Sequence, residues 1–154
     1  MTHPLLFVHK TDIVTSMEMR DRIADALLLA RPDPKQLSAL ALAYLGDTVY
    51  DLYVRTLLTF GTAGTVHTLH QKSTKLVCAK GQAEAFFCIQ PMLDEEEAAV
   101  YRRGRNAHGA TVPKNASVQE YRTATGFEAL IGYLYCLGRD ERIAELMRTA
   151  LKKE

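Results

Sequence analysis

Two acidic residues in this chain lie within otherwise apolar helical patterns and could together hold a divalent cation. Asp47 lies in the segment AYLGDTVY at residues 43–50, and Glu128 lies in the segment FEALIG at residues 127–132. Taking a carboxylate out of water is costly unless it contacts a cation or a metal ion. Because hard divalent cations prefer oxygen ligands, two such side chains on separate helices could meet across a core and bind one.

The same two acids also have a simpler interpretation. Asp47 could be a helix-surface acid that pairs with Arg55 or a lysine, and Glu128 could form a buried ion pair with Arg55 or Arg122. The residue before Asp47 is Gly46, which has no side chain. Glycine in a helix interior destabilises the helix by about 1 kcal/mol relative to alanine. Close approach of another backbone or of a ligand would explain this glycine. The residue pattern alone leaves both interpretations open.

A long helix is expected over residues 34–60, and it carries the first acid. Asp33 is a typical N-cap residue and Pro34 suits the first helical position. Apolar residues recur along this segment at helical spacing and form one stripe. Gly61 and Gly64 mark the end of the helix.

The rest of the chain follows the same 3.6-residue periodicity, and no segment shows a strand pattern. Short helices joined by short loops predict an all-α helical bundle. Residues 108–116 lack periodicity and are expected to form a loop. Further helices are expected within residues 1–33 and over residues 66–89, 94–106, 117–138 and 140–151, with a bend or second segment at Gly81. Three of them are expected to begin with a capping box, formed by Thr15 with Glu18, Asp94 with Glu97, and Ser117 with Glu120.

The composition fits one globular domain and excludes several classes of protein. The chain has 154 residues, of which 47% are hydrophobic and 24% charged. No apolar run approaches the roughly 18–20 residues that span a bilayer, and the N-terminus does not resemble a signal peptide. The three cysteines, an odd number without C-x-x-C spacing, indicate free buried thiols and a cytoplasmic protein. The sequence has no glycine-rich phosphate-binding motif, so nothing in it points to a nucleotide cofactor. His67 and His70 have no further cysteine, histidine or acidic residues nearby that would complete a zinc site.

Local charge points to a phosphate-binding surface although the net charge is only +1. Residues 94–100 hold four acids and no basic residue, whereas residues 101–125 hold five basic residues and one acid. A basic patch can bind nucleic acid whatever the total charge is. The alternative is a solvated helix surface, since acids in a first turn and arginines in a last turn suit the helix dipole. The candidate RNA-binding residues are Lys72, Lys75, Arg102, Arg103, Arg105, Lys114 and Arg122.

These motifs also resemble a known family. The LGD run at residues 45–47 and the EALIG run at 128–132 resemble the two acidic motifs of the ribonuclease III family. The segments RRGRNA at 102–107, TVPKN at 111–115 and YR at 121–122 resemble one branch, Mini-ribonuclease III, which lacks a separate double-stranded-RNA-binding domain. The resemblance covers the chain from about Pro34 to the C-terminus. It implies a catalytic domain over residues 34–154, preceded by an N-terminal extension over residues 1–33.

In that family the acids that match Asp47 and Glu128 bind the catalytic magnesium. Full-length ribonuclease III has further acids where this chain has Ala43, Leu40 and Thr125, and Mini-ribonuclease III shares this reduced set. Two carboxylates suffice if magnesium keeps its other waters. Asp51, one turn after Asp47, is the nearest spare acid and is a candidate for an outer-sphere or RNA contact, or else a surface acid.

The resemblance implies a homodimeric, magnesium-dependent endoribonuclease that cuts double-stranded RNA. The implied substrate is the precursor of large-subunit (23S) ribosomal RNA. The family forms two active sites at a dimer, and Tyr44, just before the LGD run, is the candidate interface residue. The alternative for Tyr44 is an ordinary core aromatic. Two other functions remain as alternatives, an α-helical magnesium-dependent nucleotide pyrophosphohydrolase and a non-catalytic RNA-binding relative.

Overall fold

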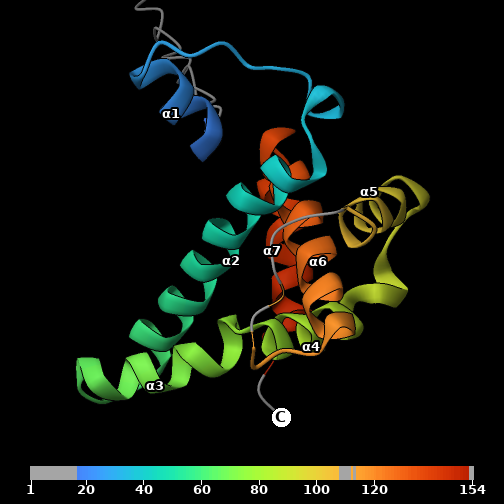
Figure 1. The fold of residues 1–154 in the computed structure, drawn as a ribbon. Helices are drawn as coiled ribbons and strands as arrows, with labels where there is room; N and C mark the ends of the chain where they lie inside the picture. Colours follow the sequence, from blue (N-terminus) through green and yellow to red (C-terminus); the bar gives the residue numbers. More distant parts are fainter. Residues whose placement is uncertain (1–16, 108–111, 113, 153–154) are drawn as a thin grey trace, which may run out of the picture.

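The computed structural model describes residues 17–107, 112 and 114–152, and this part of the chain is helical without a strand (Figure 1). The all-α prediction is therefore confirmed. The α-helices are α1 (Met19–Ala26), α2 (Ala39–Gly61), α3 (Val66–Val77), α4 (Ala79–Ile89), α5 (Glu95–Arg105), α6 (Val118–Cys136) and α7 (Asp140–Ala150). Two single-turn 3-10 helices occupy Pro34–Gln36 and Gln90–Met92.

Helix α6 is the centre of the bundle, and α2, α4, α5 and α7 pack around it. Its residues from Thr123 to Leu134 are all buried except Glu128. Tyr50 of α2 packs edge-on against Phe127 of α6 with ring centroids 5.1 Å apart. Because side chains on all sides of α6 are apolar, the helix can be enclosed by neighbours without stranding polar groups.

Two glycines allow α2 and α6 to cross in backbone contact. A Cβ atom on Gly46 would lie 1.8 Å from the carbonyl oxygen of Glu128, and one on Gly132 would lie 1.9 Å from the carbonyl oxygen of Leu42. The expectation that Gly46 permits close approach of another backbone is confirmed. The crossing places the residue after Gly46, which is Asp47, beside α6.

Some helix ends agree with the sequence and one does not. The capping boxes of Asp94 with Glu97 and of Ser117 with Glu120 are both present. The predicted start of the long helix at Pro34 was wrong. Asp33 caps only the first 3-10 helix, and α2 begins five residues later, where the Ser38 hydroxyl accepts from the backbone N–H of Ala41.

The predicted second segment within residues 66–89 exists, but the break lies at Cys78 rather than at Gly81. Cys78 has an extended backbone, and its sulfur accepts from the N–H of Gly81 at 3.4 Å, so it ends α3 and caps α4. All three cysteines are free, as expected. The expectation that they are buried was wrong, because Cys78 and Cys88 are exposed and Cys136 is half-buried.

The N-terminal helix α1 lies at the periphery of the bundle (Figure 1). It is attached near the α6–α7 turn, where Arg20 donates to the carbonyl of Cys136 and the N–H of Met19 donates to Asp140. Thr15 of the predicted capping box lies outside the described residues. None of the helices in the described part of the chain combines the length and apolar composition that a bilayer-spanning helix requires.

A buried ion pair fixes the start of α5 against α7. Glu97 is 1% exposed, and Arg142 donates to its two carboxylate oxygens at 2.8 and 2.9 Å. The same guanidinium donates to the carbonyl of Met92 at 2.7 Å. Because the charges are paired and hydrogen-bonded, removal of either partner would leave a costly buried charge.

Candidate metal centre

The α2–α6 crossing brings Asp47 and Glu128 together, as the sequence predicted. The pKa of Glu128 is raised to about 8, first by burial, then by the negative charge of Asp47, and it is partly lowered again by hydrogen bonding from Gln82. Gln82 also donates from Nε2 to Oδ1 of Asp47 at 3.0 Å. Glu128 is half-buried, but Asp47 is exposed, so the expected burial holds only for Glu128.

The ion-pair alternatives for these two acids are not observed. Arg55 pairs with Asp51 instead, with Nε of the arginine 2.7 Å from Oδ2 of the aspartate. In the described part of the chain, neither Asp47 nor Glu128 forms a salt bridge with a lysine, an arginine or a histidine. Two carboxylates therefore face each other with a neutral amide as their hydrogen-bonding partner.

This donor set fits a divalent cation. Two carboxylates in mutual repulsion are stabilised by a positive ion between them, and a cation such as magnesium completes its shell with water. Within residues 17–107, 112 and 114–152, no group of three or more histidine, cysteine or acidic side chains could hold a metal. The site is thus a two-acid centre. Asp51 is the neighbouring acid, with Oδ1 buried and lacking a hydrogen-bond partner among the described residues.

Sequence reasoning missed Gln82 as part of this site. It lies in the first turns of α4, among the buried positions Gly81, Ala83, Phe86 and Ile89. An amide at a position where helical periodicity calls for an apolar residue is a signal that could have been noticed. Its side chain is 2% exposed and points to the two carboxylates.

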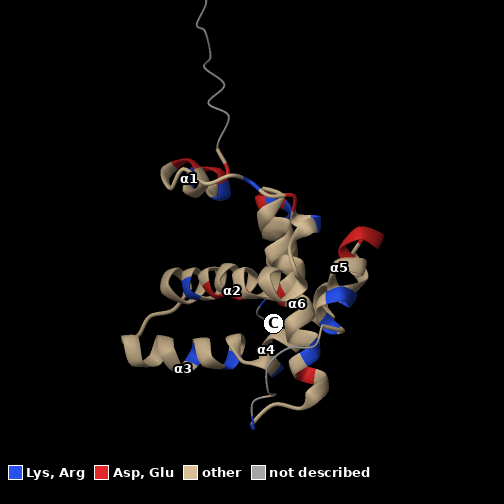
Figure 2. Ribbon diagram, turned by 45° about the horizontal axis from the view of Figure 1, so that its top comes forward, with Lys and Arg blue, Asp and Glu red and all other residues tan. Residues whose placement is uncertain are grey.

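The candidate RNA-binding residues are all exposed and lie in two groups. Lys72 and Lys75 lie on α3, whereas the arginines lie near the C-terminal end of α5 and the N-terminal end of α6 (Figure 2). The acids at the start of α5 lie at its opposite end, as helix-dipole complementarity favours. Of the predicted loop over residues 108–116, residues 108–111 and 113 lie outside the described residues, whereas Lys114 is described and exposed.

The arginines of α5 have different surroundings. Arg103 donates to the carbonyl of Leu37 at 2.9 Å and so ties α5 to the segment before α2. Arg102 and Arg105 line a cleft of about 570 Å³ between α4, α5 and the start of α6. Phe87 is 59% exposed and lines the same cleft.

Tyr44 is not a core aromatic. It is 85% exposed, so that alternative was wrong. Leu40 and Leu52 of the same helix are also exposed. The uncovered face of α2 is therefore more apolar than a surface helix requires.

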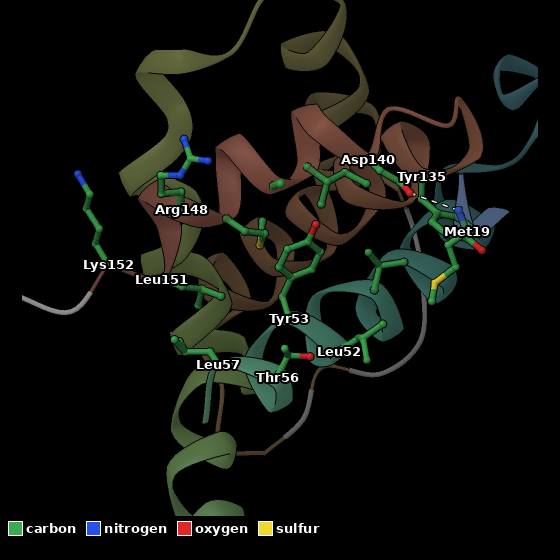
Figure 3. A pocket seen from close by; sticks show the side chains of 14 residues that line it. Met19, Leu52, Tyr53, Thr56, Leu57, Tyr135, Asp140, Arg148, Leu151 and Lys152 are labelled. Carbon is green, nitrogen blue, oxygen red and sulfur yellow. Dashed lines mark hydrogen bonds between the residues drawn. The ribbon is translucent and has the colours of Figure 1, made fainter. Parts of the chain in front are cut away.

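A cavity of about 760 Å³ lies between α2 and α7 and is lined mainly by apolar side chains (Figure 3). Tyr53 lies in the middle of it, with Arg148 and Lys152 at one end and Met19 with Asp140 at the other. Asp47 and Glu128 do not line this cavity. The candidate metal centre is thus a separate site.

The chain is similar in sequence and fold to several known proteins. A model of the ribonuclease III domain matches residues 40–139. The Mini-ribonuclease 3 of Clostridium tetani is 46% identical over 122 residues, which cover 79% of this chain and 81% of that protein. The Mini-ribonuclease 3 of Enterococcus faecalis is 46% identical over 79% of this chain and 93% of its own length. The crystal structure of protein FN1578 from Fusobacterium nucleatum is similar, with a TM-score of 0.69 and 34% identity over 77% of this chain and 95% of that chain.

Proposed function

The chain belongs to the ribonuclease III family of endoribonucleases, and on this premise we propose that it cleaves double-stranded RNA with magnesium held by Asp47 and Glu128. The observation that carries the proposal is the meeting of these two carboxylates at the α2–α6 crossing without a basic partner among the described residues. Family membership does not support the pyrophosphohydrolase or the non-catalytic alternative.

The two acids would have complementary roles. Asp47 is exposed and can meet an RNA backbone at the protein surface, whereas Glu128 is recessed in α6. Magnesium, when bound, neutralises charge on a phosphodiester and lowers the pKa of a bound water. Asp47 and Glu128 would hold the ion, and because the pKa of Glu128 is raised to about 8, metal binding would release a proton near neutral pH.

The exposed basic residues are proposed to bind the phosphates of an A-form duplex. Proteins recognise duplex RNA mainly by its shape, its phosphates and its 2′-hydroxyls. The side chains of Arg102, Arg105 and Lys114 are exposed and form no hydrogen bond to the described residues, so they are available for phosphates. Arg103 contributes less, since its guanidinium is engaged with Leu37. Lys72, Lys75 and Arg122 complete the proposed set.

Two copies of the chain are proposed to form the active enzyme, with the exposed Tyr44 in the interface. A duplex has two strands, and two centres related by a twofold axis can reach one strand each. The apolar face of α2 supplies surface that association would bury. The substrate that we propose is precursor 23S ribosomal RNA, from the family resemblance alone, and the location that we propose is the cytoplasm, which the cysteine usage favours.

A cleavage assay tests the proposed function. The protein is incubated, with and without magnesium, with each of three substrates: labelled duplex RNA, a single strand of the same sequence, and a nucleoside triphosphate. The wild-type protein should cut only the duplex and only with magnesium. Asp47→Asn and Glu128→Gln should each lose at least about a hundredfold in rate, because removal of one group that stabilises transition-state charge typically costs about 10²–10³. A variant that keeps more than about a hundredth of the wild-type rate would show that the catalytic centre lies elsewhere.

A further inference from the structure

Gln82 is a buried polar side chain that reaches both carboxylates of the candidate centre. Its Nε2 donates to Oδ1 of Asp47 at 3.0 Å, and the same side chain lies close enough to Glu128 to lower the pKa of that carboxyl. With 2% exposure, it has given up its contact with water. An apolar residue would fill this position of α4 without that loss, so packing alone does not account for the amide.

The α3–α4 corner holds Gln82 in a fixed place. Cys78 caps the helix one turn before Gln82 and accepts from the N–H of Gly81. A Cβ on Gly81 would lie 2.6 Å from the carbonyl oxygen of Leu76, so α4 begins in direct contact with the end of α3. The hydroxyl of Tyr50 donates to that same Leu76 carbonyl at 3.1 Å and ties the corner to α2. These contacts fix the start of α4, and with it the position of Gln82, relative to α2 and α3.

We propose that Gln82 is a positioning residue for the metal centre, which orients Asp47 and Glu128 for a divalent cation through its amide hydrogens. The inference rests on the proposed function of these two acids. The amide group has two donor hydrogens and can engage one oxygen on each carboxylate. The remaining lone pairs of the carboxylates then stay available to the ion, and the exposed Asp47 side chain is held in one rotamer.

Gln82 acts through the carboxylates and does not touch the ion. Because its hydrogens, not its carbonyl oxygen, face Asp47, it stabilises the ionised acids by hydrogen bonding. Partners of this kind typically change metal affinity or activity by about 10–100-fold when removed. The effect should appear in metal affinity rather than in RNA affinity, since no basic side chain is involved.

The test replaces the amide with a side chain of similar length that has no strong donor, Gln82→Met. The matched control is Gln36→Met, the same change at an exposed glutamine in the first 3-10 helix. Magnesium is titrated into wild type, both variants and Asp47→Asn, and binding is measured by calorimetry and by the magnesium-dependent rise in Tm. Cleavage of duplex RNA is then measured at saturating magnesium.

Gln82→Met should weaken magnesium binding about 10–100-fold while KM for RNA stays within about threefold of wild type and excess magnesium restores kcat. Gln36→Met should match wild type. Unchanged magnesium affinity in Gln82→Met, with binding still absent in Asp47→Asn, would overturn the role of Gln82 and leave the proposed function standing. Equal magnesium binding by wild type and Asp47→Asn would overturn the proposed function itself. If Gln82→Met does not fold, Gln82→Asn, whose amide is one carbon too short to reach Asp47, gives the same comparison.

Discussion

Gly46 of α2 lies directly against the backbone carbonyl of Glu128 in α6, so close that a single methyl group on Gly46 would end 1.8 Å from that oxygen. No real Cβ tolerates such a contact, and a backbone carbonyl cannot rotate away as a side chain can. The contact therefore sets the distance between the two helices. It also sets the spacing of the two carboxylates, because Asp47 follows Gly46 and Glu128 supplies the carbonyl.

Gly46→Ala should destabilise the fold and separate the carboxylates. The added methyl group must push the helices apart. Overpacking typically costs about 1–3 kcal/mol, and a clash with backbone belongs at the upper end of this range, above the roughly 1 kcal/mol that alanine gains in helix propensity. Urea unfolding and magnesium titration are the measurements. Gly61→Ala is the matched control on the same helix, since a Cβ there meets nothing within 4 Å. A Gly46→Ala protein as stable as Gly61→Ala would show that the crossing is not tight.

The stability of the metal-free protein should fall as pH rises through the range where Glu128 titrates. The folded pKa is about 8 against 4.5 for the free side chain, so between these values the folded state keeps a proton that the unfolded chain has lost. Stability contributed by Glu128 is therefore present below about pH 4.5 and lost toward pH 8. Glu128→Gln should remove this pH dependence and stabilise the metal-free protein by on the order of 2–3 kcal/mol at pH 7.

The measurement is urea unfolding in EDTA from pH 5 to 8 for wild type and Glu128→Gln. The difference in unfolding free energy between the two proteins should grow with pH. Magnesium should reverse the order for the wild type, since binding to the ionised pair stabilises only the protein that retains both acids. A constant difference across the pH range would show that Glu128 is not buried beside another negative charge.

The exposed arginines of α5 should govern the salt dependence of RNA binding. Each phosphate contact contributes roughly 0.7–0.9 to the slope of log affinity against log salt. Replacing Arg102 and Arg105 with alanine should therefore flatten the slope by up to about 2 units and raise KM, while kcat falls less because the carboxylates remain. Lys35→Ala removes one exposed charge elsewhere and serves as the control. Slopes that match wild type would assign the two arginines to the helix dipole and solubility alone.

Tyr44 should decide the oligomeric state. Tyr44→Asp places a charge on the apolar face of α2 and should convert a species of twice 17.2 kDa into one of 17.2 kDa by light scattering. Tyr44→Phe keeps the ring and should leave the larger species intact. A wild-type monomer that is active on duplex RNA at micromolar concentration would contradict the proposed dimer.

The sequence by itself determined the local features. The capping boxes at Asp94 and Ser117 are present as expected because each depends on residues three apart in the chain. The helical fold class follows from periodicity, and the LGD and EALIG motifs identified the two acids that the structure brings together. The sequence did not determine which of two nearby residues caps the long helix. Asp33 and Ser38 both suit a helix start, but only Ser38 caps α2.

The tertiary structure alone decided how these elements meet. It added Gln82 to the site, because a contact between α4 and α2 depends on the α3–α4 corner and not on any local pattern. It also decided which apolar residues stay uncovered: Tyr44 and Phe87 match the helical stripes as well as the buried residues do, yet both are exposed. Periodicity marks the side chains that can be buried, but only the packing of helix against helix determines which of them have a neighbour.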